Sequence, residues 1–445
     1  MRLRRRLILG HLADLYRLAL PVVVSRAGVL AMTVADTVIV GRYSAIELGY
    51  LSLGVAVYLP LLLTVMGLLT GTTVAAAQAM GRGEEAESGA AWRRAVPVAL
   101  GFGALGLVLG SFGREMLLLA GQGEDVAAGA GRVFFILALG YPAGFLYFAT
   151  AFFLEGIRHP RPVAWAIITA NLVNIPADLL LVHGLLGLPA LGAEGSAWAT
   201  TGIRWGLAVF LLTYVWWMPG RERFAIRARA SWHGRRWRVQ RMVGYAAAVA
   251  IAVEMGAFTA IHLFAGWLGT VPLAVFTIVL NVISVIFMIA NGVGIATGVR
   301  IGNAYGRGDR QRWIAAGWMG LAATICLMAA AGALMAACAR PLAAIYSSEA
   351  AVLAAAIPVL VLAGLLPVFD GGQTLMLNAL RGCSDAWVPT ALQAFAFIGC
   401  MVPLALLLAF ELERGVAGLF EAVVLSTAVS LGLLCARFVM LSRRA

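Results

Sequence analysis

Residues 218–241 read MPGRERFAIRARASWHGRRWRVQR and divide the chain of 445 residues close to its centre. The stretch holds eight arginines against one acid, Glu222, and the sequence on either side is strongly apolar. A dense basic block between apolar runs is typical of a cytoplasmic loop, because basic loops stay on the cytoplasmic side of a membrane. The stretch therefore predicts a basic linker, residues 219–240, between two membrane-embedded lobes, residues 1–218 and 241–445.

The composition points to lipid as the solvent of this chain. Hydrophobic residues make up 62% of it, charged residues only 12%, and the mean hydropathy is +0.91. Soluble domains average about 45–50% apolar and about 25% charged residues. The net charge of +12 comes from arginines alone, and they fall mainly in short loops on one side. Membrane topology explains this charge, and we expect no nucleic-acid partner.

Twelve apolar runs are long enough to cross a bilayer, which takes about 20 helical residues. The predicted spans are approximately 14–40, 48–78, 92–111, 126–155, 162–186, 195–218, 241–267, 272–302, 312–337, 350–380, 388–410 and 415–439. Arginine-rich loops alternate with arginine-poor loops, which places both termini in the cytoplasm. The predicted fold is an all-α polytopic membrane protein with twelve transmembrane helices in two six-helix lobes.

The two lobes repeat each other in sequence at an offset of about 225 residues. Met80-Gly81-Arg82-Gly83-Glu84 corresponds to Tyr305-Gly306-Arg307-Gly308-Asp309, and Pro142 corresponds to Pro367. Six spans per copy give both copies the same orientation, as in transporters built from parallel repeats. The repeat therefore favours a two-lobed transporter with a central cleft.

Charged side chains inside spans are costly and mark candidate functional sites, although a buried pair that only fixes packing is the alternative. Asp36 lies in the first span. Asn174 and Asp178 lie four residues apart and hence on one face of the fifth, and Thr200 reaches a comparable depth in the sixth. These oxygen-rich side chains predict a site for Na⁺, or a pair of acids that shares a proton.

The second lobe has its own pair of deep acids. Glu254 lies midway along the seventh span and Asp370 at a similar depth in the tenth, too deep for either carboxylate to reach the headgroups. They predict a second site for Na⁺ or a proton. Apolar and amide side chains of the same lobe are candidates for a substrate cavity: Asn281, Phe258, Phe287, Met288, Phe369 and Gln373.

Two arginines also fall within spans. We expect Arg26 and Arg204 each to pair with a buried acid or to reach a cavity; the alternative is competition with cations for the acids of the first lobe. Trp216, Trp217 and Trp313 lie near span ends and predict an aromatic belt at the membrane interface.

Enzyme motifs are missing from the sequence. It has no P-loop, no HExxH, no GxSxG and no His/Cys cluster with metal-ligand spacing. We expect no enzymatic activity and no cofactor, so energy for concentrative transport has to come from an ion gradient.

Three sequence motifs resemble those of the MATE (multidrug and toxic compound extrusion) family, particularly its NorM-like branch. They are Val34-Ala35-Asp36-Thr37-Val38-Ile39-Val40-Gly41, Asn174-Ile175-Pro176 followed by residues 187–195 and Ala199-Thr200, and Phe369-Asp370 with Leu380-Arg381-Gly382 and Asp385. The resemblance covers nearly the whole chain. It implies two six-helix lobes around a central cavity and export of cationic, amphipathic compounds in exchange for Na⁺ or H⁺.

By position, the resemblance assigns Asp36, Asn174, Asp178 and Thr200 to a first-lobe ion site, and Glu254 and Asp370 to the second-lobe cation site of the NorM-like branch. Two departures stand out: Phe276-Thr277 replaces a common His-Gln pair, and Asp178 replaces an asparagine. The extra acid favours protons, and Na⁺ stays an open alternative.

The sequence thus predicts a monomeric secondary multidrug transporter of a bacterial inner membrane, working by alternating access, with the bilayer and small organic cations as its partners. A lipid-linked saccharide flippase of the same superfamily is the first alternative, and it would need arginines in its cavity for pyrophosphate. A multispan membrane enzyme, such as an acyltransferase, and a membrane scaffold without transport activity are the others.

Overall fold

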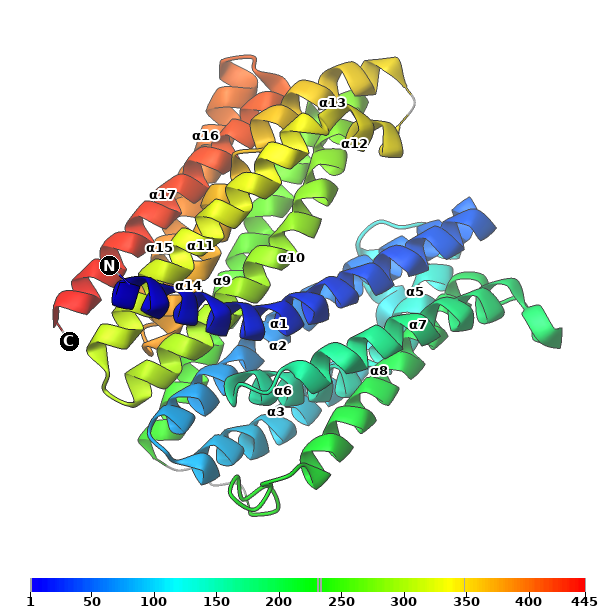
Figure 1. Ribbon diagram of the computed structural model, residues 1–445. Coiled ribbons are helices and arrows are strands. Elements are labelled where there is room, and N and C mark those ends of the chain that lie inside the picture. The colour runs from blue at the N-terminus through cyan, green and yellow to red at the C-terminus, as the bar shows by residue number, and fades with distance from the viewer. Residues whose placement is uncertain (1, 230–231, 233, 348, 445) are drawn as a thin grey trace. The chain divides into compact units, whose positions relative to one another are not determined.

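The computed structural model describes residues 2–229, 232, 234–347 and 349–444, and every regular element in these ranges is a helix (Figure 1). By contacts, the chain forms two compact units. The N-terminal unit is Val24–Ala248, and the C-terminal unit is Val249–Ala445 together with Met1–Val23. The helices α1 (Arg2–Tyr43) and α9 (Arg235–Trp267) therefore each contribute residues to both units.

Between α1 and α9, the N-terminal unit contains α2 (Ala45–Gly81), α3 (Glu85–Ser111), α4 (Gly113–Leu119), α5 (Glu124–Ala138), α6 (Tyr141–Gly156), α7 (Arg161–His183), η1 (Leu185–Gly187) and α8 (Gly192–Trp217). The C-terminal unit contains α10 (Thr270–Gly306), α11 (Arg310–Ala337), α12 (Ala339–Tyr346), α13 (Ala350–Ala363), α14 (Leu366–Gly382), α15 (Trp387–Ala394), η2 (Phe395–Met401), α16 (Val402–Leu406), η3 (Leu407–Glu411) and α17 (Gly415–Arg444).

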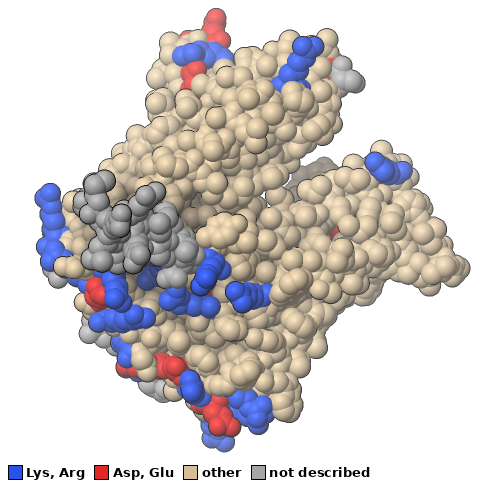
Figure 2. Space-filling view, viewed as in Figure 1, with Lys and Arg blue, Asp and Glu red and all other residues tan. Residues whose placement is uncertain are grey.

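The described helices make this a multi-pass membrane protein. Nine of them are each long and apolar enough to cross a membrane. Two further pairs of helices, each bent at a short break, bring the number of candidate spans to eleven. The helix α8, with 26 residues, occupies the position of the sixth predicted span and completes the predicted set of twelve. Figure 2 shows charged side chains gathered near helix ends, with broad uncharged surface between them.

Two predicted spans are not single helices. The fourth consists of α5 and α6, bent by 41°, and the tenth consists of α13 and α14, bent by 44°. Pro142 and Pro367 lie in the first turn of α6 and α14. Because proline has no backbone N–H, it is tolerated at a helix start and interrupts a longer helix. The prolines that mark the sequence repeat thus mark a repeated break in the structure.

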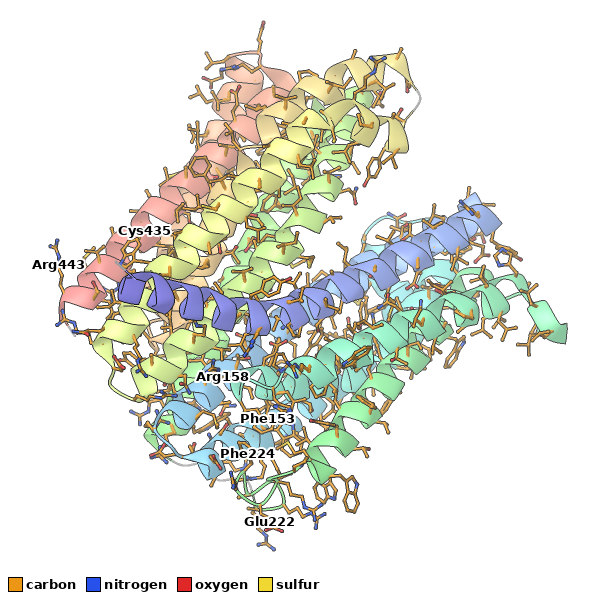
Figure 3. The ribbon with its side chains drawn as sticks, viewed as in Figure 1. Phe153, Arg158, Glu222, Phe224, Cys435 and Arg443 are labelled. Carbon is orange, nitrogen blue, oxygen red and sulfur yellow. The ribbon has the colours of Figure 1, made fainter. Side chains whose placement is uncertain are left out.

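The first part of the basic linker packs on the N-terminal unit. Arg93 of α3 donates a hydrogen bond to the backbone oxygen of Phe224, 3.2 Å away, and another to that of Ala225. The Phe224 ring packs edge-on against Phe153 of α6, with ring centroids 5.9 Å apart (Figure 3). The linker residues Ala230, Ser231 and His233 lie outside the described residues. The linker and lobe boundaries predicted from the sequence differ from those of the two units defined by contacts, and they stay a prediction.

The prediction of an aromatic belt is wrong for one of its three tryptophans. Trp216 and Trp217 are 42% and 64% exposed at the end of α8, as expected for a membrane interface. Trp313 is only 2% exposed and packs edge-on against Phe438, with ring centroids 5.4 Å apart. A position near a helix end does not reveal that a neighbouring helix covers it.

Close approach of backbones joins α2 to the start of α9. A Cβ atom at Gly71 would overlap the backbone oxygen of Gln240, and one at Gly244 would overlap that of Leu68. Small residues at such crossings let membrane helices pack by van der Waals contact, which largely replaces the hydrophobic driving force there. The linker end of α9 is thereby fixed to the N-terminal unit.

This packing predicts the effect of added volume at Gly71. Gly71→Val should lower the thermal unfolding midpoint in detergent, because overpacking costs about 1–3 kcal/mol and here the obstacle is backbone. Gly49→Val is the matched control on the same helix, since a Cβ at Gly49 meets no atom within 4 Å. Equal unfolding midpoints for the two variants would contradict this account of the α2–α9 contact.

Candidate functional site

The four residues predicted for the first-lobe ion site are in contact with one another. Asn174 Nδ2 donates hydrogen bonds to Asp36 Oδ1 at 2.7 Å and to Asp178 Oδ2 at 2.8 Å. Thr200 Oγ1 donates to Asp36 Oδ2 at 2.8 Å. All four side chains are buried. We call Asp36, Asn174, Asp178 and Thr200 the first acid cluster.

The helices bring this cluster together from three distant parts of the chain. Asp36 lies on α1, Asn174 and Asp178 lie one turn apart on α7, and Thr200 lies on α8. Ser196, also on α8, is a buried neighbour of Asp178 that the sequence did not predict, and its Oγ has no hydrogen-bond partner among the described residues. Ser196 precedes Thr200 by four residues and so faces the same side of its helix, which is the signal that would have found it.

The first acid cluster has oxygen atoms to spare. Asn174 Oδ1 and Asp178 Oδ1 are buried and accept no hydrogen bond from the part of the protein that the structure describes. Carboxylate, amide and hydroxyl oxygens are the donors that hard cations such as Na⁺ prefer. Two adjacent carboxyl groups can instead hold one proton between them. The residues present therefore suit either coupling ion.

In the C-terminal unit, each predicted acid accepts a hydrogen bond from a glutamine. Gln373 Nε2 donates to Asp370 Oδ1 at 2.9 Å, and Gln393 Nε2 donates to Glu254 Oε2 at 3.1 Å. Gln393, on α15, was not predicted from the sequence. The amide oxygens of both glutamines are buried and have no hydrogen-bond donor among the described residues. We call Glu254, Asp370, Gln373 and Gln393 the second acid cluster.

One interaction between an arginine and an acid recurs in both units with the positions of the two charges exchanged. In the N-terminal unit, Arg26 of α1 forms a buried ion pair with Glu155 of α6, with 3.0 Å between Nη2 and Oε1. In the C-terminal unit, Glu254 of α9 interacts electrostatically with Arg381 of α14. Glu155 and Arg381 correspond in the sequence repeat. The corresponding positions of the two units thus carry opposite charges, which form an ion pair in the N-terminal unit and only interact electrostatically in the C-terminal unit.

The two arginines within spans have different partners. The Arg26–Glu155 pair agrees with the expectation of a buried acid. Arg204 instead donates a hydrogen bond to Tyr58 Oη at 2.6 Å, and its guanidinium lies 4.6 Å from the centre of the same ring. No acid within the described ranges forms an ion pair with Arg204, so the expected acidic partner is replaced by the face and hydroxyl of a buried tyrosine.

The candidate substrate residues are spread over several helices. Phe287 and Asp370 lie around one narrow gap that is too small to hold a water molecule. Phe258 packs edge-on against Phe397, with ring centroids 6.2 Å apart. The Asn281 amide donates a hydrogen bond to the backbone oxygen of Thr277 at 2.8 Å. The three other candidates are close in sequence to Phe287 on α10 or to Asp370 on α14: Met288, Phe369 and Gln373. Their role in substrate binding stays a prediction.

A sequence-family comparison identifies the chain. The model of the MatE family matches residues 21–180 and again residues 246–407. The protein belongs to the MATE family. The two matches are the internal repeat that the sequence predicts, one in each half. MATE proteins are transporters, so the expectation that this chain is not an enzyme is confirmed.

Curated relatives and solved structures of MATE proteins resemble this chain along its whole length. It is 36% identical to the probable multidrug resistance protein NorM of Caulobacter vibrioides, over 98% of this chain and 93% of that protein. It is 30% identical to the multidrug resistance protein PmpM of Pseudomonas aeruginosa, over 98% and 93%. The crystal structure of the eukaryotic MATE transporter AtDTX14 superposes with a TM-score of 0.87 at 20% identity, over 97% and 96%.

The buried ion pair of this MATE protein predicts a reversal between single and double variants. Glu155→Gln should destabilise the protein by about 3–5 kcal/mol, because it leaves the Arg26 charge buried without a partner. Arg26→Met combined with Glu155→Leu should recover most of that loss, since it removes both charges. Thermal unfolding in detergent measures both. If the double variant were as unstable as Glu155→Gln, the cost of the single variant could not be explained by an unpaired buried charge.

Proposed function

We propose that this protein is a secondary active multidrug efflux transporter that exports cationic, amphipathic compounds in exchange for protons by alternating access. The observation that carries the proposal is the first acid cluster, in which the buried amide of Asn174 donates hydrogen bonds to two carboxyl groups inside a membrane-spanning unit. The membrane is a bacterial inner membrane, with both termini cytoplasmic and a monomer as the working unit.

The proton is favoured over Na⁺ by the contacts of the first acid cluster. Both Asp36 oxygens already accept hydrogen bonds, one from Asn174 and one from Thr200. Asp178 Oδ2 accepts a hydrogen bond from the same Asn174 amide group, which holds the two carboxyl groups close together. Two unit charges about 4 Å apart repel by about 4 kcal/mol at an effective dielectric constant of 20. A proton on either carboxyl group removes this repulsion.

The second acid cluster supports a cationic substrate. Organic cations are stabilised by carboxylates and by aromatic ring faces. Asp370 and Phe287 lie around the same narrow gap, which is too small to hold a water molecule and would have to widen for a substrate, and the charges of Glu254 and Asp370 interact. Both relatives described above carry the words "multidrug resistance" in their names, which supports this substrate class.

The flippase alternative is disfavoured by the partners of the two arginines on which it depends. Arg26 is neutralised by Glu155, and Arg204 is occupied by Tyr58. A pyrophosphate would have to displace these contacts before either guanidinium could bind it. The deep acids of both units further oppose an anionic substrate.

The test is uptake of a fluorescent organic cation into everted membrane vesicles. A proton gradient without Na⁺ should drive uptake by the wild type, and a Na⁺ gradient at fixed pH should not. Asp36→Asn and Asp178→Asn should each slow proton-driven uptake about tenfold or more, since a hydrogen bond to a charged group contributes about 1.5–3 kcal/mol. Glu254→Gln and Asp370→Asn should also cripple it, by removing charge from the substrate site.

Glu411→Gln is the matched control, because it neutralises an exposed acid outside both clusters. Folded protein in the vesicles is quantified for every variant. Wild-type uptake by all four acid variants would refute the assignment of the clusters, and uptake driven only by Na⁺ would replace the proton as the coupling ion.

A further inference from the structure

A pocket of about 340 Å³ lies within the N-terminal unit, between α2, α3 and the first turns of α9. None of the residues of the two acid clusters lines it. One end of the pocket is polar and carries Arg94, Gln240 and Arg241, while Phe102 and Leu105 belong to its apolar wall. A cavity with one charged end and one apolar wall suits an amphipathic ligand.

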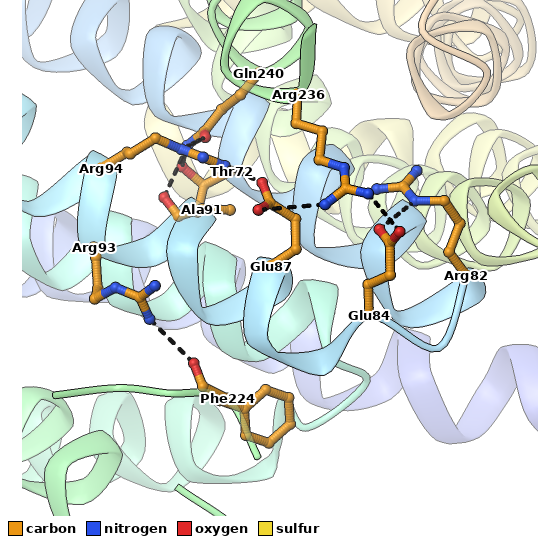
Figure 4. A network of polar contacts seen from close by, with 10 residues as sticks. All are labelled: Thr72, Arg82, Glu84, Glu87, Ala91, Arg93, Arg94, Phe224, Arg236 and Gln240. Atoms are coloured by element: carbon orange, nitrogen blue, oxygen red, sulfur yellow. Dashed lines mark hydrogen bonds and ion pairs between the residues drawn. The ribbon is translucent and has the colours of Figure 1, made fainter. Parts of the chain in front are cut away.

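The polar end is held in place by a buried network (Figure 4). Arg94, only 1% exposed, donates hydrogen bonds to Gln240 Oε1 at 3.0 Å and to Glu87 Oε1 at 2.7 Å. Gln240 Nε2 in turn donates to the backbone oxygen of Ala91 at 2.9 Å. The Arg94 guanidinium is therefore fixed at the pocket wall before any ligand arrives.

A second guanidinium at this end is available to a ligand. Arg241 is exposed and lies 5.7 Å from the Trp237 ring centre, which is its one described contact. It forms no ion pair with any acid in the described ranges. The pocket lining contains these two arginines and no acid. Arg94 is ion-paired with Glu87, so the positive charge that an anion would meet at this end is that of Arg241.

The apolar wall has the depth of one membrane leaflet. Leu105 follows Arg94 by eleven residues on α3, about 16 Å along the helix, and half of a typical hydrocarbon core is about 15 Å. The wall is open at Gly101, where a Cβ would meet no atom within 4 Å. Trp237 and Tyr245 line the pocket, and such aromatic residues are enriched at the headgroup level.

We propose that this pocket binds an anionic phospholipid, with the phosphodiester between Arg94 and Arg241 and an acyl chain along α3 and α2. Basic pockets between membrane helices recognise anionic headgroups in this way. The bound lipid joins α3 to the first turns of α9, next to the linker. The proposal does not depend on the transported substrate or the coupling ion.

Native mass spectrometry of the purified protein in detergent tests the site. Phosphatidylglycerol should bind the wild type, and phosphatidylcholine with the same acyl chains should bind at least about fivefold less. Arg241→Gln should weaken phosphatidylglycerol binding about fivefold, the factor that one basic residue contributes near an anionic lipid surface. Gly101→Leu should weaken it as strongly, because its side chain fills the apolar wall without changing charge.

Two control variants separate the pocket from general effects. Arg238→Gln removes an exposed charge from the same helix outside the pocket, and Gly206→Leu adds the same side chain at an exposed, uncrowded position of α8. Both should bind phosphatidylglycerol like the wild type.

Three results would overturn the proposal. The first is wild-type binding of phosphatidylglycerol by both pocket variants, and the second is an equal loss of that binding in the control variants. The third is displacement of the lipid by free glycerol phosphate at comparable concentration, which would make this a phosphate site only. Arg241 and Gly101 both lie at exposed positions, so their variants should elute as folded protein in size-exclusion chromatography, and that elution is measured with each binding experiment.

Discussion

A charge inside a bilayer has to find its partner within the protein, because hydrocarbon offers none. This constraint organises the buried polar groups of both units. Glu155 is placed against Arg26, Asp36 receives hydrogen bonds from Asn174 and Thr200, and Arg204 rests on a buried tyrosine. The helices that carry these side chains are far apart in sequence, so satisfying the charges also fixes which helices pack together.

The two acid clusters satisfy the same constraint with different chemistry, and the difference suits different ligands. The first cluster is compact, with one amide bridging two carboxyl groups. In the second, each acid has its own glutamine, and an arginine acts on Glu254 electrostatically. A compact pair suits a proton, whereas two acids beside phenylalanines suit a larger cation. Exchange follows if each ligand favours a different conformation of the transporter.

The sequence was sufficient for the helical fold and for the acids, because both depend on local signals. Length and hydropathy reveal spans, and an acid inside an apolar run is visible without a structure. Glu155 was overlooked because it falls at the end of an apolar run, and its partner Arg26 is 129 residues away. The bends after α5 and α13 were missed because two bent helices read as one apolar run. Docking of the linker depends on arginine contacts with backbone oxygens, which leave no sequence signature.

The central claim is that binding of an organic cation and binding of a proton oppose each other in this protein. Proton release on addition of a fluorescent organic cation to the purified transporter, in weakly buffered detergent solution, tests it most directly. The account predicts release of protons in step with cation binding, and loss of that release in Asp36→Asn while some cation binding remains. Saturable cation binding without proton release at any pH at which the protein is folded would contradict it.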